Sequence, residues 1–207
     1  MAKNKEVGLW GATAVSDTMS FFNIPGSSMV QKSVEAAYER RTKAAQDVLL
    51  EMLSKHGPQT LDDLPEGEMD DLIQMLMRYG KAAMEGAARE NLRLLAAVIA
   101  GLKRNRALSF DKFQECANVL ETLTRDEILF LGHFYRHRKA NPGKNDYNAF
   151  RKEAEQVFGK DRFESVAAGL VRTGMLLPIA ALSGSNIYVP SERFFTVCEL
   201  AEIGDEE

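Results

Sequence analysis

Residues Glu66–Arg104 read EGEMDDLIQMLMRYGKAAMEGAARENLRLLAAVIAGLKR, a stretch without proline. Its apolar residues recur about every 3.6 residues, which is typical of an amphipathic helix. The stripe consists of Met69, Leu72, Leu76, Ala83, Ala87, Leu94, Val98 and Leu102. Acidic residues gather at the start and basic residues at the end, as the helix dipole favours. The pattern predicts one helix of about 58 Å, at a rise of about 1.5 Å per residue.

The middle of this stretch is narrow, because it consists largely of glycine and alanine. Another helix could approach closely at Gly80, Ala83 and Ala87. Asn91 lies near the stripe, where a polar residue can fix the register between two helices. The contact could be a seam between two copies of the chain or the core of a single bundle. Glycine in a helix costs about 1 kcal/mol relative to alanine, so Gly80 and Gly86 indicate either close packing or a kink.

The chain has 207 residues, enough for one large domain or two small ones. Its formal net charge is −4, and the two parts 1–124 and 125–207 carry −2 each (15 basic against 17 acidic side chains, then 11 against 13). No overall basic field therefore draws the protein to nucleic acid or to an anionic membrane.

Several features favour a reduced, cytoplasmic location. The two cysteines, Cys116 and Cys198, are too few for a disulfide framework and form no CxxC pair. Residues 1–27 lack the apolar core of a signal peptide. The apolar run near residue 98 is shorter than the roughly 20 residues of a membrane span, so no transmembrane segment is predicted.

Residues 1–27 are interpreted as an N-terminal arm, because they show no sustained periodicity. The arm carries the only tryptophan, Trp10, together with Phe21, Phe22 and Ile24. So many large apolar groups are expected to dock on another surface, which could be the chain's own bundle, a second copy or a membrane. The arm lacks the basic face of a membrane-binding helix, which favours the first two.

A helical pattern begins at residue 28 and ends before Gly57-Pro58. The connection to the long stretch is short, so residues 28–105 are expected to form an antiparallel helical hairpin for packing or self-association. Ser109 or Asp111 can cap a bridging helix within residues 106–123.

Residues 124–203 contain three more helical patterns, two short apolar runs and a last helix. Thr124-x-x-Glu127 and Asp161-x-x-Glu164 are capping-box patterns, and Gly159 ends the helix between them. The apolar runs 176–182 and 187–189 flank a turn, and Pro190-Ser191 begins the last helix.

This order of three helices followed by a two-stranded wing resembles a winged helix. The expected fold class is therefore mainly α: a long antiparallel helical hairpin, then a winged-helix-like domain with a small β-hairpin. Residues 204–207 would form a loose acidic tail.

In winged helices that bind DNA, the third helix enters the major groove. Here it would expose Arg162, Ser165 and Arg172, whereas Ala168 and Gly169 leave its centre without donors for base edges. The candidate face for nucleic acid or a partner protein comprises Arg136, Lys144, Arg151, Arg162, Ser165 and Arg172. Nearby carboxylates would repel phosphate, so a protein partner is favoured over nucleic acid.

No catalytic signature is present, since the chain lacks GxSxG, Walker and GxGxxG motifs. His133 and His137 have the i,i+4 spacing of zinc ligands, but the glutamate of an HExxH motif is absent. The acidic cluster from Asp62 to Asp71 does not match an EF-hand and suits a helix start. No catalytic residue, metal or cofactor is therefore predicted.

Together, these features favour a non-enzymatic regulatory or scaffolding protein. It would form a homo-oligomer through the long helices and bind a protein partner through the winged-helix-like domain. The alternative is a DNA-binding transcriptional regulator whose hairpin dimerises. A third hypothesis is an enzyme or metal protein that uses His133 and His137. A winged helix serves protein and DNA contacts alike, so the fold does not decide between the first two.

Overall fold

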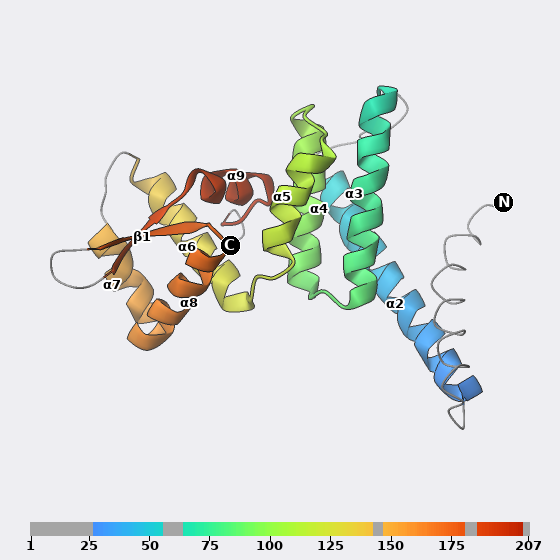
Figure 1. Cartoon of the computed structure of the whole chain (residues 1–207), viewed down its shortest axis with the longest axis horizontal. Coiled ribbons are helices and arrows are strands. Elements are labelled where there is room, and N and C mark those ends of the chain that lie inside the picture. Colours follow the sequence, from blue (N-terminus) through green and yellow to red (C-terminus); the bar gives the residue numbers. More distant parts are fainter. Residues whose placement is uncertain (1–26, 56–63, 143–146, 181–185, 205–207) are drawn as a thin grey trace.

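The structure is a computed structural model that describes residues 27–55, 64–142, 147–180 and 186–204. Within these residues the fold is mainly α with one small antiparallel sheet, as the sequence predicts at that level. The elements are α2 (Ser27–Ser54), α3 (Glu66–Glu85), α4 (Arg89–Arg104), α5 (Phe110–Leu120), α6 (Arg125–Ala140), α7 (Tyr147–Phe158), α8 (Lys160–Arg172), β1 (Leu176–Ala180), β2 (Asn186–Pro190) and α9 (Glu192–Leu200). Figure 1 shows α2–α5 gathered on one side and α6–α8 with the sheet on the other.

The prediction of one helix over Glu66–Arg104 is wrong, because the chain breaks between α3 and α4. Gly86 adopts φ 92°, a left-handed conformation that glycine reaches without a steric penalty. Its N–H donates to the carbonyl of Ala83, and the N–H of Ala87 donates to that of Ala82. These two bonds form a Schellman motif, which satisfies the last carbonyls of α3 and ends the helix. Gly86 therefore marks a stop between two helices.

Helices α2 and α3 lie side by side and run in opposite directions. Arg41 donates to the carbonyl of Met84, and the Tyr79 hydroxyl donates to that of Ala45, so positions rise along α2 as they fall along α3. Among the α2 side chains that the structure describes, the buried ones are Ala45, Val48 and Met52. The N-terminal part of α2 extends beyond the other helices (Figure 1).

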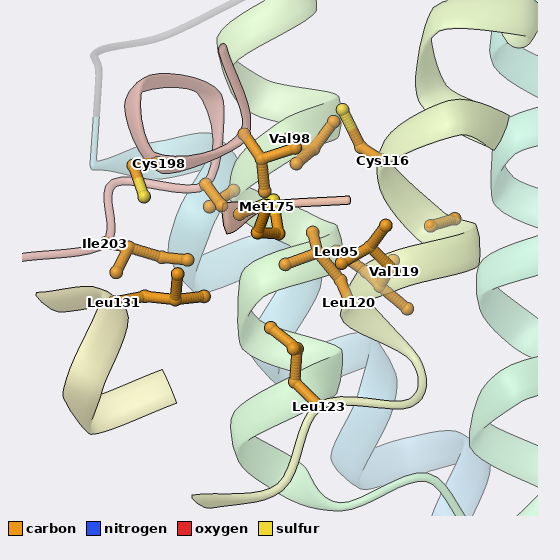
Figure 2. Packing of buried hydrophobic residues seen from close by; sticks show 14 of the residues in the cluster. Leu95, Val98, Cys116, Val119, Leu120, Leu123, Leu131, Met175, Cys198 and Ile203 are labelled. Atoms are coloured by element: carbon orange, nitrogen blue, oxygen red, sulfur yellow. The ribbon is translucent and has the colours of Figure 1, made fainter. Parts of the chain in front are cut away.

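Helix α4 is the most deeply buried element, and every residue from Leu95 to Leu102 is buried. It packs against α2, α3 and α5 on one side and against α9 on the other. In Figure 2, Leu95 and Val98 of α4 lie among side chains of α5, Met175, Cys198 and Ile203. One continuous apolar core therefore joins the two groups of helices.

The predicted capping box is confirmed, because Thr124 forms a full box with Glu127 at the start of α6. Of the two candidates for α5, Ser109 is the cap, and its hydroxyl accepts from the N–H of Lys112. At the predicted start of α9 the Ser191 hydroxyl accepts from the N–H of Phe194. The predicted box at Asp161 is wrong. Gly159, at φ 79°, occupies the N-cap position of α8, so Asp161 already lies inside the first turn.

The sheet is a two-stranded ribbon in which β1 pairs with β2 from Leu176↔Pro190 to Ala180↔Asn186. Beneath it, α6–α8 share an aromatic core. Phe134 and Phe150 stack with ring centroids 4.1 Å apart, and Phe130 and Phe163 pack around them. No helix in the described ranges is long and apolar enough to cross a membrane. The arm before Ser27 and the tail after Gly204 lie outside the described residues.

Candidate interaction surfaces

The arginines of the predicted binding face are partly engaged within the chain. Arg162 at the start of α8 donates two hydrogen bonds of 2.6 Å to the carboxylate of Asp126. Arg151 donates to Glu155 at 2.7 Å and to Glu164 at 2.6 Å. The other oxygen of Glu164 accepts from the Tyr188 hydroxyl, so this network ties α7 and α8 to β2. Their guanidinium donors therefore serve the fold.

The remaining members of that face are spread out. Ser165 and Arg172 are exposed on α8, and Arg136 of α6 lies against the carbonyl of Gly204 at 3.4 Å. Lys144 lies outside the described residues. Gly169, expected to be exposed, is instead half-buried against Glu127 of α6, so near that a Cβ would overlap the carboxylate. Of the predicted reading positions, α8 thus presents Ser165, Ala168 and Arg172, beside the paired Arg162.

The ribbon has a different character. Residues 176–190, which include both strands and the residues between them, contain no lysine, arginine, aspartate or glutamate. Leu177 and Ile179 point to one face of β1 and are 50% and 49% exposed. Their cross-strand partners, Val189 and Ile187, lie on the same face. The ribbon therefore offers an uncharged, apolar face.

The outer edge of β1 is poorly suited to pairing with another strand. Ser191 N–H donates to the carbonyl of Met175, so the alternate residues Leu177 and Ile179 also bond toward β2. Pro178 between them points its backbone nitrogen outward, where it supplies no donor. Contacts at the ribbon are therefore expected through side chains.

The four residues predicted for self-association have different environments. Asn91 is buried and donates to the carbonyls of Leu120 and Leu123 at 2.6 and 2.9 Å, which anchors α4 to the end of α5. Ala83 is buried and Ala87 is half-buried against the core. Gly80 faces open space, with no atom within 4 Å of where a Cβ would lie.

An exposed apolar stripe on α3, which includes the half-buried Gly80, was not predicted from the sequence. Ile73, Met77, Gly80 and Met84 follow each other at helical spacing, and Met77 is 70% exposed. The signal was present in the sequence. Apolar residues of α3 occur on more than one side of the helix, so the stripe through Met77 was not distinguished from the stripe through Leu72 and Leu76.

A groove runs beside this stripe, between α3 and α5. The α3–α5 groove has a volume of about 720 Å³, and its lining combines the apolar Met77, Ala82, Met84 and Phe110 with the polar Gln74, Arg78, Lys81, Glu85, Gln114 and Glu121. Arg78 crosses it to bind Glu121 at 3.0 and 3.1 Å and Asn118 at 2.8 Å. Its volume falls within the range of about 300–1,000 Å³ that is usual for ligand pockets.

The two histidines pack on different aromatic rings of α7. His133 lies edge-on to Phe158, with centroids 6.1 Å apart, and His137 lies 5.5 Å from Phe150. Nδ1 of His137 is 3.4 Å from a Glu153 carboxylate oxygen. Burial, followed by the charge of Arg136, lowers the pKa of His133 below its usual value. In the described part of the chain, no three His, Cys, Asp or Glu side chains lie together as metal ligands.

The space beside His137 is small. A cavity of about 10 Å³ lies between His137, Tyr147 and Tyr188, and this is room for about one water molecule. Both cysteine thiols are free and buried. Burial raises the pKa of Cys116 to about 11, and burial also raises the pKa of Cys198.

Comparison of the chain with protein-family models, with curated proteins and with solved structures finds no match.

Proposed function

We propose that this chain is a non-enzymatic helical regulatory or scaffolding protein. It self-associates through the helices of residues 28–105 and binds a protein partner through a winged-helix-like domain at 124–203, with 106–123 as the bridge. The succession of α6, α7 and α8 before the β1–β2 ribbon supports the likeness to a winged helix. The free, buried cysteines fit a reduced cytoplasmic setting.

The uncharged ribbon is the observation that carries the choice of a protein partner. A wing that binds DNA gains affinity from lysine and arginine beside the phosphates. Here the wing has none of these residues and exposes Leu177 and Ile179 instead. Such apolar side chains favour a partner that buries them, because burial gains about 25 cal/mol per Å² of apolar surface.

The α3 stripe supports self-association. Ile73, Met77 and Met84 are exposed apolar side chains, and the open space at Gly80 lets another helix approach closely. Ala83 and Asn91 contribute indirectly, since they fix α3 and α4 within the bundle. A second copy that packs the same stripe would form a two-fold interface, the commonest arrangement in oligomers.

Light scattering across a range of protein concentrations tests the self-association. We expect a mass above that of one chain, which Met77→Glu reduces to one chain because a charge would be buried in the contact. Leu177→Glu is the matched control, an equally polar change on the ribbon that should leave the mass unchanged. A single-chain mass for the parent at every concentration would contradict the proposal.

The alternative is a DNA-binding regulator, which the exposed Arg172 and Ser165 on α8 favour. Selection of genomic fragments by the purified protein separates the two functions. We expect no enriched motif, and no duplex affinity tighter than about 10⁻⁶ M at physiological salt. A common motif that disappears in an Arg162→Ala, Arg172→Ala double variant would establish the DNA-binding function instead.

A further inference from the structure

We propose that the α3–α5 groove is the docking site for the chain's own N-terminal arm, with Trp10 as the residue that enters it. Met77, Ala82, Met84 and Phe110 form the apolar part of the groove's lining. Arg78 and Glu121, which also line it, bind one another, and the polar residues Gln74, Lys81, Glu85 and Gln114 complete it. The described residues leave this apolar lining uncovered, so an apolar side chain is the occupant that it fits.

The reach of the chain selects Trp10. Helix α2 passes the end of the groove where Arg41 donates to the carbonyl of Met84. Ser27, at the start of α2, lies about 21 Å beyond that point at a rise of about 1.5 Å per residue. Returning to Met84 and continuing along α3 to Met77 then requires about 32 Å. Seventeen extended residues between Trp10 and Ser27 span up to about 56–61 Å, which is sufficient.

The other aromatic residues of the arm are placed too near to α2. Phe22 precedes Ser27 by five residues, so it reaches at most about 18 Å and falls short of Met84. The chain between Trp10 and Ser27 is therefore long enough to reach the groove, whereas the chain between the Phe21-Phe22 pair and Ser27 is too short.

The chemistry of the groove also suits an indole ring. Methionine is flexible and polarizable, and its sulfur makes favourable contacts with aromatic rings. Met77 and Met84 line one wall, and Phe110 at the start of α5 adds an aromatic neighbour. A covalently attached arm has an effective concentration in the millimolar range, so the chain's own arm outcompetes the arm of a second copy.

Trp10 is the only tryptophan in the chain, so its fluorescence in the full-length protein reports this contact directly. At concentrations where light scattering shows a single chain, we expect emission at shorter wavelength than in the urea-unfolded chain, slow quenching by acrylamide, and no change on further dilution. Met77→Glu and Phe110→Ala should each shift the emission to longer wavelength and speed the quenching severalfold. Leu177→Glu is the control that should change neither, and circular dichroism checks that each variant is folded.

Three results would overturn the assignment. Emission equal to that of the unfolded chain would mean that Trp10 is in water. If Trp10 is protected, but neither Met77→Glu nor Phe110→Ala changes its emission or quenching, then Trp10 docks at another surface. Protection that disappears on dilution would mean that the groove receives the arm of a second copy.

The arm would also regulate assembly, a consequence that rests on the proposed self-association. Met77 and Met84 belong to both the groove and the exposed stripe, so the arm and a second copy compete for them. Trp10→Ala should therefore raise the oligomer fraction in light scattering. If Trp10 is protected in the parent, and both the parent and Trp10→Ala stay monomeric, the groove assignment holds and the proposed self-association is contradicted. A Trp10 that stays solvent-exposed at concentrations where the protein is a single chain would contradict the groove alone.

Discussion

Gly80 and Gly86 lie six residues apart on the same segment and have opposite conformational needs. Gly86 has φ 92°, and a Cβ there would lie 3.4 Å from the Arg41 guanidinium, whereas Gly80 is an ordinary helical residue with open space where its Cβ would be. Gly86→Ala should lower the free energy of unfolding by about 1–2 kcal/mol, the cost of a left-handed L-residue. Gly80→Ala should raise it by about 0.5–1 kcal/mol.

Urea unfolding followed by circular dichroism measures both glycine variants, and each serves as the control of the other. Shifts of the same sign would contradict the different backbone conformations of the two positions.

His133 is expected to make stability depend on pH. Its folded pKa is lowered, chiefly by burial, so protonation favours the unfolded chain. This contribution is complete above the unfolded pKa of about 6.5 and is lost as pH falls below that value. The urea concentration at the unfolding midpoint should therefore be lower at pH 5.5 than at pH 7.5, and His133→Gln should make this difference smaller. An unchanged pH dependence in the variant would show that other groups cause it.

Among the helices and strands, the caps at helix starts could be predicted from the sequence, whereas the break between α3 and α4 could not. Ser109, Thr124 and Ser191 each lie three residues before the backbone N–H from which their hydroxyl accepts. This spacing is local, so it can be read in the sequence. The helix break was harder, because glycine and alanine on both sides of Gly86 carry little apolar periodicity. The stop depends on one left-handed residue and two backbone hydrogen bonds.

The candidate surfaces show the same limit. Arg162 and Asp126 lie 36 positions apart, and Arg151 and Glu164 lie 13 apart, so only the folded chain brings these charges together. The absence of charge from residues 176–190, by contrast, can be read from the sequence directly.

Helices α2 and α4 should differ strongly in amide hydrogen exchange. Residues Leu95–Leu102 of α4 are all buried, so they should exchange only by global unfolding. Residues 35–44 of α2 are helical but exposed or half-buried, and they should exchange fastest among the helices. Mass spectrometry of deuterium uptake measures both. Equal protection of the two segments would mean that a further surface covers the start of α2.

The continuous core makes cooperative unfolding the expectation for the whole molecule. One apolar cluster contains Val98 of α4, Cys198 of α9, and Met175, which precedes β1 (Figure 2). The helices α2–α5 and the helices α6–α9 therefore share this core. Far-ultraviolet and near-ultraviolet circular dichroism should therefore report the same urea midpoint.

Gly101→Ala probes this coupling, since a Cβ there would lie 3.0 Å from the carbonyl oxygen of Leu200 in α9. The substitution should lower both midpoints together. Two separate transitions, with only one affected, would instead show that residues 124–203 unfold as an independent domain.

The ion pairs at Glu202 carry a consequence for the protein as it is being made. Lys55 and Arg104 bind the two carboxylate oxygens of Glu202, 147 and 98 positions further along the chain. A ribosome adding about 5–20 residues per second needs about 5–20 s to advance from Arg104 to Glu202. Throughout that interval the side of α4 that α9 will cover has no partner. That side of α4 should therefore stay exposed on the nascent chain until α9 has been made.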